Sequence, residues 1–149
     1  MRLQPAVIAM PVYNGPMEEG KKAFAAYYNA GPIEKLSQEV TYPELNRLQN
    51  ESATYGNRKT FKATVVTSLA PERFRYIFDE FSRLVAEIPE TVGSAVQIEL
   101  IPYSKIASVP TNATAFGNRG EWYNIHFSMR WKSVHLDARV RPIIFYTQA

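Results

Sequence analysis

Cysteine is absent from this chain of 149 residues. Disulfide bonds and thiolate metal sites are therefore excluded, although the redox compartment stays undecided. The sequence also lacks any apolar run of about 18 residues, so we predict no transmembrane helix. We expect no secretory signal, because the first residues contain no long hydrophobic segment with a cleavage site. The compartment is left open, with the cytoplasm slightly favoured.

Phosphate-binding loops and clusters of charge are missing as well. The seven glycines are scattered, and neither G-x-G-x-x-G nor G-x-x-x-x-G-K-[ST] occurs. The net charge is only +3 and the Lys and Arg residues are dispersed, which argues against a nucleic-acid-binding protein. No His or carboxylate side chains have the spacing of metal ligands, so we propose no metal site.

The most regular pattern lies in residues 122–131, where apolar and polar side chains alternate. Side chains of a β-strand point to opposite faces with a period of two residues. One face of this predicted strand carries Tyr123, Ile125, Phe127, Met129 and Trp131, and the other carries Trp122, Asn124, His126, Ser128 and Arg130. Such a strand packs its apolar face on a core and offers its polar face to water or to a cavity.

The clearest predicted helix covers residues 71–88. Pro71 suits the first helical position, and Pro89 ends the helix. Apolar residues recur between them at three- and four-residue spacing, as one buried face requires: Phe74, Ile77, Phe78, Phe81, Leu84, Val85 and Ile88. We interpret this stripe as core.

The remaining pattern predicts a mixed fold. Another helix is expected over residues 17–29, and a short helical turn from Pro43 is expected to bury Leu45 and Leu48. Further strands are expected over residues 7–13, 60–68 and 96–100. We therefore predict a single α+β domain, an antiparallel sheet of about four or more strands with helices packed on one face.

Several short motifs follow one another in a fixed order. They are Y-N-G-P-M-E-E-G at residues 13–20, G-P at 31–32, T-Y-P-E-L-N at 41–46, Q-I-E-L-I-P at 97–102, S-V-P at 108–110 and T-A-F-G-N-R at 114–119, before the alternating strand. In this order, over roughly residues 10–135, they resemble the substrate domain of berberine bridge enzyme-like FAD-linked oxidases, nearest to fungal members. These oxidases form part of the vanillyl-alcohol oxidase/para-cresol methylhydroxylase superfamily.

The resemblance implies a domain that works beside a flavin. The family holds its FAD mainly through an N-terminal domain, which this sequence does not contain. We therefore expect one truncated substrate (cap) domain over residues 1–149, with a divergent tail at about 138–149. FAD is the implied cofactor, but this chain alone is not expected to bind it tightly. The implied partners are a small-molecule substrate and either an FAD-binding chain or a second copy of this chain.

The polar face of the sheet is where the resemblance places the substrate cavity. There a side chain takes the substrate's proton while hydride passes to the flavin N5. Glu99 is the candidate base, with His126 next. The candidate substrate-binding residues are Gln97, Asn124, Arg119 and Ser128. His126 departs from the family pattern, because many relatives carry Gln there.

Plain structural roles compete with each of these assignments. A glutamate that alternates with apolar residues is usually a solvated strand position, and a strand histidine is more often hydrogen-bonded than catalytic. For Arg119, anchoring its own loop is favoured over binding substrate. A Ser128–His126–Asp137 assembly can be imagined, but no nucleophile elbow supports it.

Two classes of function remain open. The first is the substrate-binding part of an FAD-linked oxidoreductase, for example in fungal secondary metabolism, completed by a flavin domain. The second is a non-catalytic remnant that keeps the core and has lost redox chemistry. A small-ligand-binding α+β domain is a further reading, although it explains none of the motifs.

Overall fold

A computed structural model describes residues 4–50 and 54–143 of the chain. These residues form two compact units, one over residues 4–5 and 57–143 and the other over residues 6–50 and 54–56. The larger unit contains the sheet and the long helix, whereas the described part of the smaller unit contains three short helices. None of the helices in these described ranges has the length and hydropathy of a membrane span.

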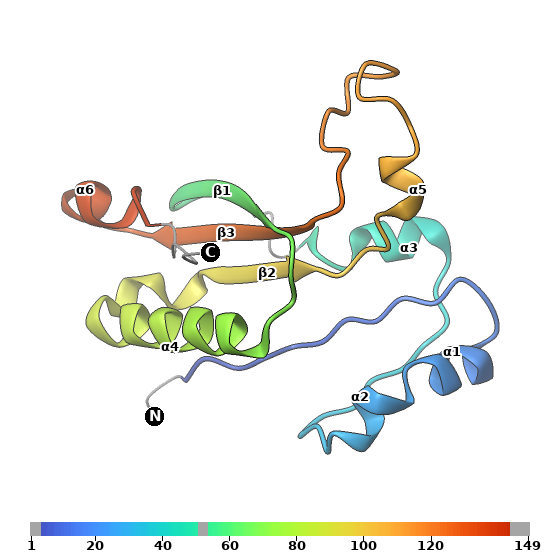
Figure 1. Ribbon diagram of the computed structural model, residues 1–149. Coiled ribbons are helices and arrows are strands. Elements are labelled where there is room, and N and C mark those ends of the chain that lie inside the picture. The colour runs from blue at the N-terminus through green and yellow to red at the C-terminus, as the bar shows by residue number, and fades with distance from the viewer. Residues whose placement is uncertain (1–3, 51–53, 144–149) are drawn as a thin grey trace. The chain divides into compact units, whose positions relative to one another are not determined.

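The larger unit is built on a three-stranded antiparallel sheet. Strands β1 (Arg58–Val66), β2 (Ala95–Glu99) and β3 (Tyr123–Trp131) lie in the order β1-β3-β2 (Figure 1). The predicted α+β class is confirmed, and each strand lies within two residues of its predicted start. The sheet has three strands rather than the four or more expected, because residues 7–13 contribute none.

The apolar face of β3 forms the centre of the core. Ile125, Phe127 and Met129 are fully buried, and Trp131 is 1% exposed. The alternation therefore predicts correctly which side of the strand faces the interior. Full burial of a large apolar side chain stabilises a fold by about 1.5–3 kcal/mol relative to exposure, so this row dominates the packing.

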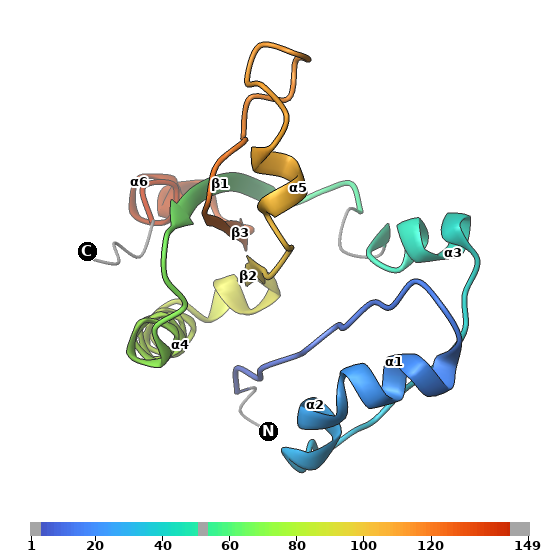
Figure 2. The ribbon, with the colours of Figure 1, turned by 45° about the vertical axis from the view of Figure 1, so that its right-hand side comes forward.

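Helix α4 (Pro71–Glu87) packs on that apolar face, as Figures 1 and 2 both show. It begins at Pro71, which needs no backbone hydrogen bond at the first helical position. Ile77, Leu84 and Ile88 enter the shared core with β3. The 3-10 helix η2 (Pro89–Gly93) then leads into β2. The predicted helix and its buried stripe are confirmed.

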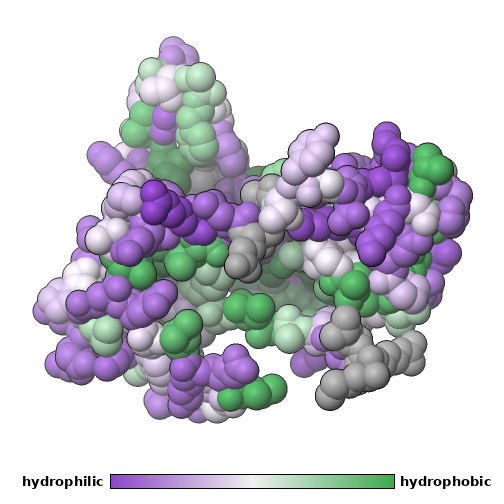
Figure 3. Space-filling model, turned by 180° about the vertical axis from the view of Figure 1, so that it is seen from behind, coloured by the Kyte–Doolittle hydropathy of each residue, from purple (hydrophilic) through white to green (hydrophobic). Residues whose placement is uncertain are grey.

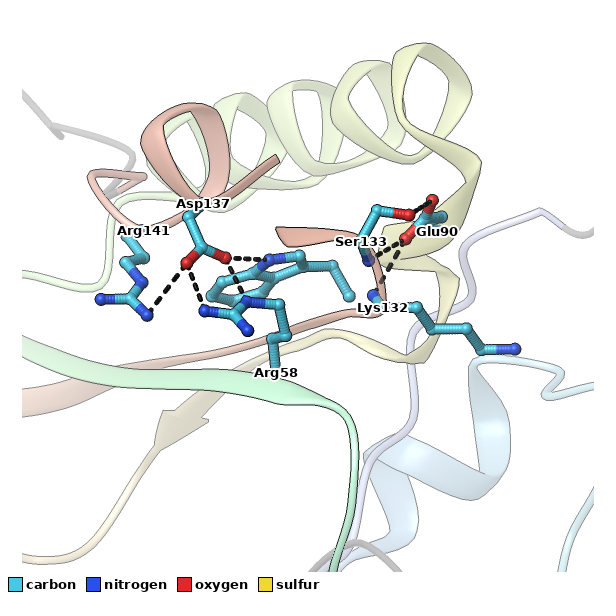
Figure 4. A network of polar contacts seen from close by, with 7 residues as sticks. Arg58, Glu90, Lys132, Ser133, Asp137 and Arg141 are labelled. Atoms are coloured by element: carbon cyan, nitrogen blue, oxygen red, sulfur yellow. Dashed lines mark hydrogen bonds and ion pairs between the residues drawn. The ribbon is translucent and has the colours of Figure 1, made fainter. Parts of the chain in front are cut away.

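A polar network ties the C-terminal part of this unit to the sheet (Figure 4). Asp137, which begins α6 (Asp137–Val140) after η3 (Val134–Leu136), accepts hydrogen bonds from both Arg58 and the Trp131 indole. The bonds from Arg58, and then that from Trp131, hold the pKa of the Asp137 carboxyl below its usual value. Val140 is fully buried in the same core, so the start of the predicted tail is integral to the fold. Residues 144–149 of that tail lie outside the described residues.

A second carboxylate, that of Glu90, binds the residues that follow β3. Glu90 accepts hydrogen bonds from the Ser133 hydroxyl at 2.6 Å and from the backbone amides of Ser133 and Lys132 at 2.8 and 2.9 Å (Figure 4). These bonds lower the pKa of Glu90, with the Ser133 hydroxyl making the largest contribution. The turn after β3 is thereby fixed to η2.

Between β2 and β3 the chain forms α5 (Ser104–Ala107) and then a long loop. This loop projects from the sheet in Figure 1 and carries hydrophobic side chains on its surface in Figure 3. Phe116 in this loop is 52% exposed. The loop ends at β3, where it contacts the polar face of the sheet.

The smaller unit consists of α1 (Met17–Ala23), α2 (Ala25–Asn29) and α3 (Tyr42–Arg47). The predicted single helix over residues 17–29 is therefore wrong at Phe24, whose φ of −105° and ψ of 22° leave the helical range. A capping box formed by Thr41 and Glu44 begins α3, and the Thr41 amide and hydroxyl both donate to the Glu44 carboxylate at 2.7 Å. These bonds, first that from the Thr41 backbone, lower the pKa of Glu44.

Two expectations for the smaller unit are wrong. Residues 7–13 form no strand, and Val7 and Ile8 are 82% and 80% exposed. A strand is stabilised by its neighbours, and no described strand pairs with this segment, while Pro11 removes a backbone donor. Leu48 is exposed rather than buried, and Leu45 is only half-buried.

Candidate functional site

The face of the sheet opposite α4 gathers most of the candidate residues; we call it the open face. Pairing between strands decides which side chains meet there. Gln97 lies opposite His126, and Glu99 lies opposite Asn124. On the other side of β3, Phe61 lies opposite Ser128. Paired residues of neighbouring strands share a face, so β3 brings together polar side chains from β2 and an aromatic side chain from β1.

The centre of the open face is a cluster of Glu99, His126 and Asn124. One carboxylate oxygen of Glu99, Oε2, lies 3.2 Å from Nε2 of His126 and accepts a hydrogen bond of 3.2 Å from the Asn124 amide. The side chains of His126 and Glu99 are 19% and 30% exposed, so solvent reaches both. The cluster thus combines a carboxylate with two donors at the surface, where a small molecule can reach it.

The ring of His126 has one satisfied nitrogen and one unsatisfied nitrogen. Nε2 faces Glu99, whereas Nδ1 is buried and has no hydrogen-bond partner among the described residues. When the ring proton is on Nε2 and this N–H group points to Glu99, Nδ1 is an unoccupied hydrogen-bond acceptor. The Phe61 ring stacks on the imidazole with centroids 5.3 Å apart and an angle of 21°. This stacking contact restricts the orientation of the imidazole on the central strand.

A chain of hydrogen bonds from the projecting loop orients the cluster. The Asn118 amide donates to the side-chain oxygen of Asn124 at 2.8 Å, and the Trp122 indole donates to the side-chain oxygen of Asn118 at 2.6 Å. Because the oxygen of Asn124 is occupied as an acceptor, its NH₂ group is directed to Glu99. Gly120 leaves room for the indole, since a Cβ there would lie 1.9 Å from the Trp122 ring.

The other candidates lie at different distances from this cluster. Ser128 is on the open face two residues beyond His126, and the exposed side chain of Gln97 lies opposite His126. Arg119 stays within its loop, where it donates to the Thr114 hydroxyl at 2.8 Å and stacks on Phe116 at 5.2 Å. These contacts agree with the alternative that Arg119 anchors its own loop. A role of Arg119 in substrate binding stays a prediction.

Three residues of this arrangement are missed by reasoning from sequence: Phe61, Asn118 and Trp122 in its bonding role. Their contacts depend on strand register and on the path of the loop, for which the sequence carries no local signal. The imagined Ser128–His126–Asp137 assembly does not form, because Asp137 pairs with Arg58 and Trp131 on the core side.

The described residues do not fit the phosphate groups of a flavin dinucleotide. Phosphate cradles place glycines of positive φ just before a helix N-terminus. The described glycines with positive φ are Gly31, which follows α2, and Gly56, which precedes β1. The same described ranges hold no group of three His, Cys, Asp or Glu residues that could bind a metal ion.

Comparison with known proteins gives one distant relative at the level of sequence. The chain is 26% identical over 137 residues to the FAD-linked oxidoreductase OXR1 of Pyricularia oryzae, a match that covers 86% of the chain. It spans only 26% of the length of that relative. No protein-family model matches the chain, and no solved structure matches it. The similarity supports a relationship to FAD-linked oxidoreductases.

Proposed function

We propose that this chain is the substrate-binding part of an FAD-linked oxidoreductase and that the open face binds a small organic substrate. The observation that carries the proposal is the cluster of Glu99, His126 and Asn124 on a solvent-accessible sheet face. A relative that is named an FAD-linked oxidoreductase and aligns with 86% of the chain supports the same reading. The berberine bridge enzyme-like subgroup and a place in fungal secondary metabolism belong to this proposal.

Glu99 is the proton acceptor in this proposal. Its Oε2 is held by His126 and Asn124, while Oε1 has no partner in the described part of the chain. Oε1 is therefore free to accept a proton from a hydroxyl group or an acidic C–H group of the substrate. His126 and Asn124 stabilise the carboxylate before the transfer and fix its direction.

The remaining open-face residues bind and orient the substrate. Gln97 and Ser128 offer hydrogen bonds on either side of the cluster, and Phe61 offers an exposed aromatic surface beside His126. The flavin itself would be bound by sequence beyond the described residues, because the described glycines form no phosphate cradle. FAD supplies the two-electron oxidation in such enzymes.

The test replaces Glu99 by Gln in a protein that contains a flavin. We would exchange the aligned segment of the Pyricularia oryzae relative for this chain and measure flavin reduction by substrates of that relative. Since a positioned base contributes about 10²–10⁴-fold, Glu99→Gln should slow flavin reduction by at least about 100-fold. The matched control is Glu72→Gln on α4, which removes the same charge on the other side of the sheet and should react at the parent rate.

Two results would contradict the proposal. The first is flavin reduction by Glu99→Gln at the parent rate, which makes Glu99 a solvated strand residue. The second is a correctly folded, flavin-loaded chimera that oxidises no substrate, which favours a non-catalytic remnant. Circular dichroism and the flavin-to-protein ratio of each variant establish that folding and loading are intact.

A further inference from the structure

The open face carries an unneutralised arginine at the end remote from Glu99. Arg130 lies four residues beyond His126 on β3, and its side chain is half-buried. Its guanidinium makes no ion pair or hydrogen bond with any described residue. Its backbone, by contrast, is fixed, because the amide donates to the Ser94 hydroxyl at 2.9 Å and the carbonyl accepts from the same hydroxyl at 3.3 Å.

A second cation lies beside it. Lys59 of β1 pairs directly with Arg130 across the sheet, so two cationic residues are neighbours on the open face. The neighbouring open-face positions are Ser128 and Ala95, which carry no negative charge.

On the opposite face of the sheet, an arginine is neutralised by a carboxylate of the same chain. Arg58, next to Lys59 on β1, points to the core side and is paired with Asp137. A cation that serves only the fold is thus neutralised within the chain, whereas Arg130 is left with its charge available. The difference between these two arginines favours a ligand role for Arg130.

We propose that Arg130 binds a carboxylate of the substrate, so that the substrate class is a small organic acid with an apolar body. This inference rests on the proposed function of the open face. Four residues of strand span about 13 Å, and Phe61 lies opposite the midpoint, Ser128. The acid group is bound at Arg130, the apolar body lies over the 65% exposed Phe61 ring, and the reacting group lies near His126 and Glu99.

The test is a binding titration of the whole chain followed by NMR of its backbone amides. The probes are 3-phenylpropionate and the matching neutral amide, 3-phenylpropionamide. The acid should shift amides of β1 and β3 around Phe61 and Arg130, and it should bind about tenfold more tightly than the amide, because a charge-assisted bond is lost in the latter. Arg130→Gln should remove that preference, whereas Arg75→Gln on α4, with the same loss of charge, should keep it.

Each outcome decides the inference. Equal affinity for acid and amide, an unchanged preference in Arg130→Gln, or shifts confined to other parts of the chain would overturn it. Glu99→Gln separates this inference from the proposed function, since it should leave the preference for the acid intact. If Glu99 proves dispensable in the chimera, the proposed proton acceptor is wrong and the anion site is unaffected. If Arg130→Gln keeps the preference for the acid, only the anion site is wrong.

Discussion

At the scale of single residues, hydrogen bonds rather than sequence position distinguish the carboxylates of this protein. One oxygen of Glu99 contacts His126 and Asn124, and the other has no partner among the described residues. Asp137 uses both oxygens, which accept from Arg58 and Trp131 and face Arg141 at 3.1 Å. The first arrangement leaves one carboxylate oxygen without a partner among the described residues, whereas in the second both oxygens are bound in contacts that hold the fold together.

The arrangement at Asp137 predicts a loss of stability in acid. Hydrogen bonding from Arg58 lowers the folded-state pKa of Asp137 below that of the unfolded chain. The stabilisation is therefore fully present above the unfolded value, about pH 4, and is lost as the pH falls through the folded-state pKa. We expect Asp137→Asn to melt at a lower temperature than the parent at pH 7, with the difference shrinking at lower pH.

The control for this prediction is Asp79→Asn, which removes an exposed carboxylate of α4. Its melting temperature should follow that of the parent across the whole pH range. Thermal melts between pH 3 and pH 7, followed by circular dichroism, check both variants. A difference between Asp137→Asn and the parent that stays constant with pH would disprove the ionic explanation.

Reasoning from sequence reaches part of the candidate site. Alternation places Asn124, His126 and Ser128 on one face of β3, and Glu99 opposite the buried positions of β2. It cannot show that Glu99 meets Asn124 and His126, because strand register depends on pairing between distant segments. The contact between Asn118 and Asn124 cannot be predicted for a further reason, because it depends on the path of an irregular loop.

At the scale of secondary-structure elements, the length of a pattern decides how well it predicts structure. Helix α4 and strand β3 have long, uninterrupted periodicity, and both form within about one residue of expectation. The segment of residues 7–13 has a shorter apolar pattern and no partner among the described strands, so the predicted strand does not form. The helix over residues 17–29 breaks at Phe24, where periodicity gives no warning.

The two faces of the sheet should respond differently to the same substitution. Phe127 is fully buried on the core side of β3, and Phe127→Ala should cost roughly 3–5 kcal/mol in the free energy of unfolding. Phe61 on the open face is 65% exposed, and Phe61→Ala should cost about 1 kcal/mol, chiefly through the lost contact with His126. Urea denaturation measures both, and similar losses in the two variants would contradict the assignment of faces.

At the scale of the whole molecule, the described residues contain a solvent-accessible polar sheet face and no phosphate cradle. It aligns with about a quarter of an FAD-linked oxidoreductase, so the relative has ample sequence for other tasks. The α+β class follows from the sequence because both the strand and the helix periods are strong. The division into two units does not, since no linker of distinctive composition marks it.

This division of tasks predicts that the chain alone binds FAD weakly. Tight binding requires backbone amides directed at the pyrophosphate, and the described glycines do not provide them. We expect the purified chain to be colourless and to retain no stoichiometric FAD after dialysis. The flavin-loaded chimera is the positive control, and a yellow chain with one FAD per molecule would overturn the prediction.

The position of β3 in the chain affects how the protein folds. The strand at the centre of the sheet is the last to leave the ribosome, because β1 and β2 precede it and pair only with it. Until residues 123–131 emerge, β1 exposes edge groups with no partner, and α4 has no apolar face to cover. Pairing Arg58 with Trp131 also closes a long loop, which slows folding. Folding of this unit during synthesis is therefore delayed until its central strand is complete, and the nascent chain depends until then on protection from aggregation.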